Sequence, residues 1–196
     1  MRLLILSAVF VFSAFGFLRA QEDNPNQILL DNALKQNQPS LQNVEAKLLE
    51  ATILSEKGEN EKAITLLQES LRINPSYAEA YYRLGIIYAN LEQYDKAIEN
   101  FNNATAIKPD FTSAYINLGA AYAYLKDYNQ ALKYLDKALS LDKENPKIYY
   151  NIGLILLVNK NNKKSAYFLS RAKELSQKNN DTLLLEKIKK LENPLK

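Results

Sequence analysis

Residues 78–111 read AEAYYRLGIIYANLEQYDKAIENFNNATAIKPDF, and residues 112–145 read TSAYINLGAAYAYLKDYNQALKYLDKALSLDKEN. Each stretch is 34 residues long, and the two align without a gap. Two further stretches of the same length, 44–77 and 146–179, flank them in register. A fixed period of this length is typical of a protein that is built from stacked repeats. Such stacks present long surfaces for binding.

Each repeat contains two apolar stripes with the i, i+3, i+4, i+7 spacing of an amphipathic helix. In the second repeat the predicted helices are residues 78–91 and 94–107. Gly85 and Ala97 are small where the two helices must approach closely. Pro109 ends the unit, because proline cannot continue a helix. No repeat can bury its apolar face alone, so the sequence predicts an all-α solenoid of four stacked repeats.

The repeated columns resemble the tetratricopeptide repeat, in which an aromatic residue, Leu-Gly, Tyr, Ala, Phe, Ala and Pro recur at fixed offsets. The second repeat carries the whole pattern as Tyr81, Leu84, Gly85, Tyr88, Ala97, Phe101, Ala104 and Pro109. The third repeat has Lys143 in place of the proline, the fourth has Ser165 in place of an alanine, and the first lacks the aromatic and the Leu-Gly pair. The resemblance covers 136 of 196 residues. It implies a right-handed α-solenoid of four helix-turn-helix repeats.

The N-terminal end of the chain falls outside the period. Residues 3–18 form a run of 16 residues without a charge, after a positive start. As a helix this run would span about 24 Å, which is less than the roughly 30 Å of a hydrocarbon core. We therefore expect residues 1–20 to be a signal peptide, cleaved after Gly16 or Ala20, with an uncleaved membrane anchor as the alternative. The expected location is periplasmic or secreted.

Two polar segments flank the repeats. Residues 21–43 are rich in Gln and Asn, and we expect an N-terminal extension or tether. Residues 180–196 are expected to form a helix, which Asp181 caps and which runs to about Glu192, and a short tail. Its apolar face and its lysine-rich opposite face suit the polar-faced cap that the open end of a solenoid requires.

Composition limits the chemistry that the chain can perform. It has no cysteine and no histidine, so disulfides, thiol chemistry and imidazole chemistry are excluded. Gly85, Gly119 and Gly153 recur at the repeat period and are therefore packing glycines, not a phosphate-binding loop. We expect no enzymatic activity, no cofactor and no metal site.

Charge is distributed unevenly along the chain. Residues 21–145 contain 12 Lys and Arg against 18 Asp and Glu, whereas residues 146–196 contain 11 against 4. The basic end favours an anionic membrane surface or an acidic protein as a partner, unless its lysines only keep the last repeat soluble. Nucleic acid is not an expected partner, because an exported chain of residues 21–196 has a net charge of only +1. We expect a monomer or weak self-association.

In tetratricopeptide proteins the first helix of each repeat lines a concave surface, where partners usually dock. The resemblance therefore implies a protein- or peptide-binding groove with the following inward residues: Tyr82, Arg83, Ile86, Asn90, Ile116, Asn117, Ala120, Tyr124, Tyr150, Asn151 and Leu154. Asn117 and Asn151 share one column and are suited to a peptide backbone, because an amide both donates and accepts hydrogen bonds. The other interpretation is that asparagine is simply common in this column. Chaperone-binding members clamp a terminal carboxylate with lysines and asparagines, and the corresponding columns here hold Leu48, Thr52 and Tyr82.

The predicted function is non-catalytic binding of a peptide or protein segment in the concave groove. The alternative is a scaffolding or assembly subunit at a membrane or envelope surface. Such a subunit would dock through its charged ends or its convex face.

Overall fold

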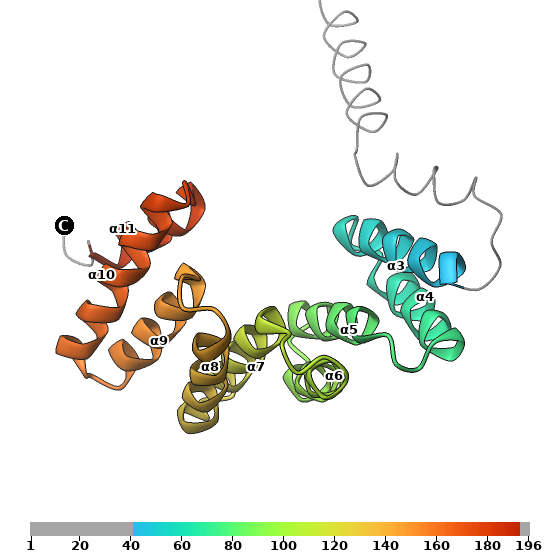
Figure 1. Cartoon of the computed structure of the whole chain (residues 1–196), viewed down its shortest axis with the longest axis horizontal. Coiled ribbons are helices and arrows are strands. Elements are labelled where there is room, and N and C mark those ends of the chain that lie inside the picture. The colour runs from blue at the N-terminus through green and yellow to red at the C-terminus, as the bar shows by residue number, and fades with distance from the viewer. Residues whose placement is uncertain (1–40, 193–196) are drawn as a thin grey trace, which may run out of the picture. The chain divides into compact units, whose positions relative to one another are not determined.

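The computed structural model describes residues 41–192, which are helical and contain no strand (Figure 1). The helices are α3 (Leu41–Glu56), α4 (Asn60–Ile73), α5 (Ala78–Asn90), α6 (Tyr94–Ile107), α7 (Thr112–Tyr124), α8 (Tyr128–Leu141), α9 (Pro146–Val158), α10 (Asn162–Lys178) and α11 (Thr182–Glu192). The expected signal peptide, most of the expected N-terminal extension and the tail after residue 192 lie outside the described residues. The prediction of an all-α solenoid is confirmed.

The chain divides into two compact units, one that ends at Ala80 and one that begins at Tyr81. In the first unit, α3 and α4 pack against each other, and Ala51 of α3 and Leu67 of α4 are both buried. Lys47 stands in the column that is tyrosine in the other repeats, and it forms an ion pair with Glu69 of α4. A polar contact thus replaces an aromatic one in the most diverged repeat.

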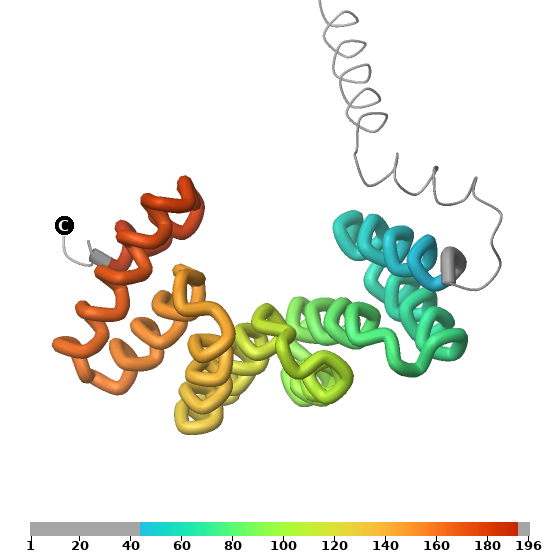
Figure 2. The backbone as a smooth tube through the Cα atoms, viewed as in Figure 1, coloured from blue at the N-terminus to red at the C-terminus, as the bar shows by residue number. Residues whose placement is uncertain are grey.

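In the second unit, each repeat is a pair of helices that reverses at a short turn, as the tube trace shows between α9 and α10 (Figure 2). A glycine of the first helix faces a large side chain of the second. A Cβ atom added to the glycine would lie 2.5, 2.6 or 2.8 Å from that side chain, in the pairs Gly85–Phe101, Gly119–Leu135 and Gly153–Leu169. The close approach that the glycine columns predict is therefore present in all three repeats of this unit.

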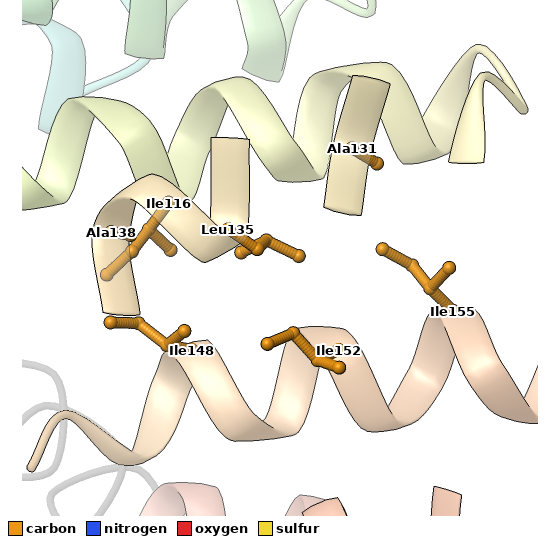
Figure 3. Packing of buried hydrophobic residues seen from close by; sticks show 7 residues of the cluster. All are labelled: Ile116, Ala131, Leu135, Ala138, Ile148, Ile152 and Ile155. Carbon is orange, nitrogen blue, oxygen red and sulfur yellow. The ribbon is translucent and has the colours of Figure 1, made fainter. Parts of the chain in front are cut away.

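The third and fourth repeats share one apolar core, which α7, α8 and α9 form together (Figure 3). Isoleucines along α9 face the small and branched side chains of α8. The buried residues of this cluster are Ile116, Ala131, Leu135, Ala138, Ile148, Ile152 and Ile155. This core fixes the first helices of the two repeats, α7 and α9, in direct contact.

The turn inside each repeat has a residue with positive φ at one column: Gly58, Glu92, Lys126 and Lys160. The N–H of the next residue bonds a carbonyl five positions back, as Asp127 does to Tyr122 at 2.9 Å. These are the hydrogen bonds of a Schellman motif, which ends a helix in a left-handed residue. The motif directs the chain from the first helix of each repeat into the second.

Helix α11 covers the open end of the fourth repeat. Leu184 and Ile188 are buried against Ala172 of α10. Asp181 caps the helix, since its carboxylate accepts a hydrogen bond from the backbone N–H of Leu184 at 3.0 Å. None of the described helices is long and apolar enough to span a lipid bilayer.

Candidate functional site: a groove along the first helices

Three hollows lie on the second unit, and residues of α5, α7 and α9 contribute to their walls. Helices α5, α7 and α9 are the first helices of their repeats. The side of each that carries the glycine packs against the second helix of the same repeat. Side chains on other sides of the first helix remain available to line a groove.

The first, which we name the acidic hollow, has a volume of about 500 Å³. Its walls come from the beginnings of α7 and α9 and from the segments that precede α9 and α11. Carboxylates dominate its charged lining, which consists of Asp142, Glu144, Lys147 and Asp181. Tyr82, Ile116 and Asn117 complete the side that faces the first helices.

The second, the central hollow, has a volume of about 200 Å³ and no charged lining residue. It lies between α5 and α7, with Ile86 and Asn90 on one side and Asn117, Ala120 and Tyr124 on the other. The third, the apolar hollow, has a volume of about 630 Å³ and lies between α7, α9 and α11. Its principal side chains are Tyr124, Tyr150, Asn151, Leu154, Val158 and Lys187.

The three hollows adjoin along α7, because neighbouring hollows share lining residues, and we name this row of hollows the groove. Asn117 belongs to both the acidic and the central hollow. Ala120 and Tyr124 belong to both the central and the apolar hollow. A ligand that occupies more than one hollow would therefore contact α7 throughout.

The structure brings ten of the eleven predicted groove residues into these hollows. Arg83 lines none of the three and is half-buried. Ile116 borders the acidic hollow but is only 7% exposed, and its side chain belongs mainly to the core in Figure 3. Their role in binding a partner stays a prediction.

Asn117 has a structural contact that the sequence did not indicate. Its amide Nδ2 donates a hydrogen bond to the hydroxyl of Tyr82 at 3.3 Å, which joins α7 to α5. An amide group has two N–H donors and a carbonyl acceptor, so this bond leaves further hydrogen-bonding capacity. Asn117 can hold the groove wall and contact a ligand at the same time.

The tyrosines of the groove differ in their surroundings. Tyr124 is 69% exposed, although its ring stacks on that of Tyr94 with centroids 4.9 Å apart. Tyr150 is half-buried, and burial, followed by the proximity of Tyr124, raises the pKa of its hydroxyl above the usual value. The Tyr150 phenol is therefore neutral at physiological pH. Tyr124 offers a large exposed apolar ring at the junction of two hollows, which is a common anchor in protein interfaces.

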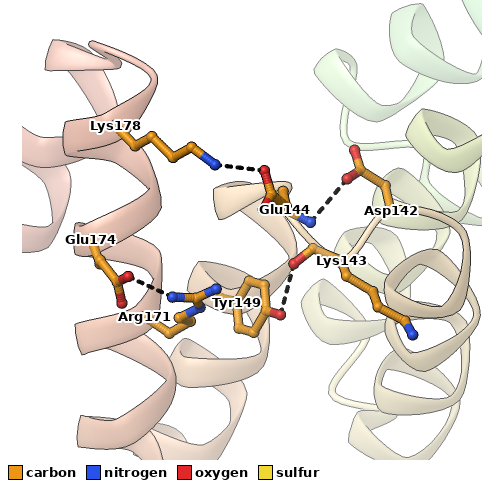
Figure 4. A network of polar contacts seen from close by, with 7 residues as sticks. All are labelled: Asp142, Lys143, Glu144, Tyr149, Arg171, Glu174 and Lys178. Atoms are coloured by element: carbon orange, nitrogen blue, oxygen red, sulfur yellow. Dashed lines mark hydrogen bonds and ion pairs between the residues drawn. The ribbon is translucent and has the colours of Figure 1, made fainter.

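Two charged residues of the groove, Asp181 and Lys187, lie outside the four repeats, and the others lie within the third and fourth repeats. Lys187 belongs to α11, and Asp181 caps that helix. Glu144 lies before α9 and forms an ion pair with Lys178 of α10 at 2.8 Å (Figure 4). The hydrogen bond and charge of Lys178 lower the pKa of the Glu144 carboxyl. The lysine-rich face expected for the last helix was the one sequence signal for Lys187.

The acidic side chains of the groove do not form a metal-binding group among the described residues. Residues 41–192 contain no group of three or more acidic side chains that could hold a metal ion. The carboxylates of the acidic hollow include Asp142, whose oxygens accept bonds from the Glu144 N–H and the Asn145 amide. Such bonds fix the loop that precedes α9 and need no catalytic explanation.

Comparisons with known proteins agree with the repeat architecture. The sequence model of the tetratricopeptide repeat matches residues 78–111 and 112–145, and a second TPR repeat model matches residues 52–92. Comparison with curated protein sequences finds no match.

Solved structures of MamA are similar to this chain. The crystal structure of MamA has 24% sequence identity and a TM-score of 0.65, over 78% of this chain and 87% of that one. MamA residues 41 to the end from Desulfovibrio magneticus RS-1 has 22% identity and a TM-score of 0.66, over 82% of this chain and 91% of that one. At these identities the similarity shows a shared fold.

Proposed function

This chain is a tetratricopeptide repeat protein, and on that basis we propose that it binds a peptide or protein segment in the groove of its second unit. The observation that carries the proposal is the row of three hollows that adjoin along α7 at Asn117, Ala120 and Tyr124. A row of adjoining hollows suits an extended chain better than a small molecule. The repeats and the similar structures support a role in protein interaction or scaffolding.

A few side chains would supply most of the binding free energy, as in protein interfaces generally. Tyr124 and Tyr150 offer aromatic area, and Leu154 offers an apolar wall. Asn117 and Asn151 can bond a peptide backbone of any sequence, with about 0.5–1.5 kcal/mol for each neutral hydrogen bond. These contributions support an affinity in the micromolar range.

The absence of cysteine and histidine from the chain supports a non-catalytic function. The remaining reactive side chains in the groove are carboxylates, lysines and phenols. Charge or packing accounts for each of these side chains without a catalytic role.

The proposal is tested by capture of partners from cells that produce the protein. The bait is the chain, beside a variant with Tyr82, Asn117, Tyr124 and Asn151 all changed to Ala. The matched control is Tyr167→Ala, which removes an equally exposed tyrosine (67%) from α10, outside the groove. We expect the control to retain its partner and the fourfold variant to lose it with unchanged helicity. Equal capture by all three proteins would refute the groove assignment.

A second candidate function, docking at an anionic membrane surface, is favoured by one patch on the fourth repeat. Leu157 and Val158 at the end of α9 are 39% and 59% exposed. Three exposed lysines follow them within the next turn and the start of α10: Lys160, Lys163 and Lys164. Exposed apolar residues beside lysines are typical of proteins that rest on anionic lipid.

Sedimentation with vesicles separates this function from groove binding. We expect binding to phosphatidylglycerol vesicles that falls when all three lysines are changed to Glu and when salt is raised. The fourfold groove variant should sediment like the parent. No sedimentation with these vesicles at low salt would eliminate the second candidate.

A further inference from the structure

The two ends of the groove carry opposite charges. The acidic hollow, at the beginnings of α7 and α9, carries Asp142, Glu144 and Asp181 against Lys147 and the Lys178 that pairs with Glu144, so a net negative charge remains. The apolar hollow, toward the other ends of the same helices, has Lys187 as its single charged lining residue. A ligand with separated charges would therefore be favoured in one orientation and disfavoured in the other.

Lys187 lacks a partner for its charge in the described part of the chain. Within residues 41–192 no carboxylate forms an ion pair with its ammonium group. Its neighbours in the hollow are apolar or neutral, among them Tyr150, Leu154 and Val158. An ammonium beside low-polarity walls attracts an anion more strongly than one that water surrounds on all sides.

The hollow also offers room for an apolar group beside this charge. Its volume of about 630 Å³ is in the range of pockets that enclose ligands. On the α7 side the lining residues Ala120 and Ala123 have small side chains, which leave space in the hollow. Tyrosine and leucine side chains line the other sides. Asn151 adds an amide that can bond a peptide backbone at the same place.

We propose that the apolar hollow receives an apolar side chain of a bound peptide, and that an acidic side chain next to it in the peptide pairs with Lys187. The inference rests on the proposed function and specifies its ligand as a peptide with an apolar–acidic pair. The acidic hollow reinforces this choice, because it repels a carboxylate at the opposite end of the groove. Basic or neutral residues of the peptide lie there instead.

Selection from a random peptide library tests the pairing. A phage library of 12-residue peptides is selected on the wild-type chain, on Lys187→Glu and on Lys190→Glu. Lys190 is an exposed lysine of the same helix that does not line the hollow, so it controls for overall charge. We expect the wild type and Lys190→Glu to enrich leucine or an aromatic residue beside Asp or Glu. Lys187→Glu should enrich the same apolar residues beside Lys or Arg.

Fluorescence anisotropy then measures one enriched peptide and its analogue with Glu replaced by Gln. Loss of the single charge should weaken binding to the wild type by about 1.5- to 5-fold. The same replacement should not weaken binding to Lys187→Glu. An unchanged acidic preference in Lys187→Glu, or no charge preference in the wild type, would overturn the inference.

The fourfold groove variant distinguishes this failure from failure of the proposed function. One outcome is that the wild type enriches peptides that the fourfold variant does not, and that these peptides show no charge preference. This outcome would refute the pairing with Lys187 and would still support groove binding. Equal enrichment by both proteins, or no enrichment on the wild type, refutes groove binding itself and the inference with it.

Discussion

A Cβ atom placed on Gly119 would lie 2.6 Å from the Cγ atom of Leu135 and 3.1 Å from the backbone oxygen of Ala131. Helices α7 and α8 therefore approach to a distance that admits no side chain at this position. The backbone oxygen cannot move aside as the end of a flexible side chain can. The contact sets the position of α7, which contributes to all three hollows of the groove.

Replacement of Gly119 by Leu should destabilise the fold by about 1–3 kcal/mol or more, because the added side chain overpacks the helix crossing. Chemical denaturation measures the loss. Ala106→Leu, at an exposed position of α6, is the control and should change stability by less than about 0.5 kcal/mol. Similar stability of the two variants would contradict the packing role of Gly119.

Replacement of Lys126 by Gly should stabilise the protein by about 0.5–1 kcal/mol. Lys126 has φ of 63°, and a left-handed conformation costs roughly 1–2 kcal/mol for a residue with a Cβ atom. Glycine removes that cost but loses part of the gain to its greater freedom in the unfolded chain. The control Lys137→Gly, in the middle of α8, should instead destabilise by about 1 kcal/mol. A thermal melt of each variant gives the sign of the stability change. A loss of stability in Lys126→Gly would contradict the left-handed conformation at this turn.

Two buried serines should respond to alanine in opposite ways. Among the described residues, the hydroxyl of Ser176 has no hydrogen-bond partner, whereas that of Ser165 donates to the carbonyl of Gly153 at 2.8 Å. Ser176→Ala removes an unsatisfied buried group and should stabilise by about 1 kcal/mol. Ser165→Ala removes a bond and should destabilise by about 0.5–1.5 kcal/mol. Denaturation midpoints that move in the same direction would exclude this difference.

The repeat columns allowed much of this fold to be predicted. The helices expected at 78–91 and 94–107 are α5, Ala78–Asn90, and α6, Tyr94–Ile107. The glycine columns indicated the crossings because a 34-residue period repeats the same packing requirement in every unit. The glycines alone were sufficient to predict these three helix contacts, since a larger side chain would clash with the facing residue.

The candidate groove was less predictable because its walls combine several elements. The repeat column predicted that Ile116 lines the groove. The Ile116 side chain instead packs mostly against apolar residues of α8 and α9. The bond between Asn117 and Tyr82 depends on the distance between two repeats, which no single repeat encodes. Lys187 reaches the apolar hollow only because α11 packs on the fourth repeat.

Deletion of residues 181–196 should cause aggregation. It removes Leu184 and Ile188, which cover Ala172, and so exposes apolar surface at the open end of the fourth repeat. Light scattering and a thermal melt measure the effect. Replacement of the exposed Leu183 by Ala is the control and should leave both unchanged. A truncated chain as soluble and as heat-stable as the parent would mean that α11 is not a cap.

Site-specific photo-crosslinking in the producing cells tests groove binding most directly. A photoreactive phenylalanine analogue replaces Tyr124 in the groove or, as the matched control, Tyr167 on α10. We predict a crosslinked partner from position 124 and none from position 167, with the crosslink lost when Asn117 and Asn151 are also changed to Ala. A partner that crosslinks from position 167 and not from position 124 would place binding outside the groove and contradict the proposed function.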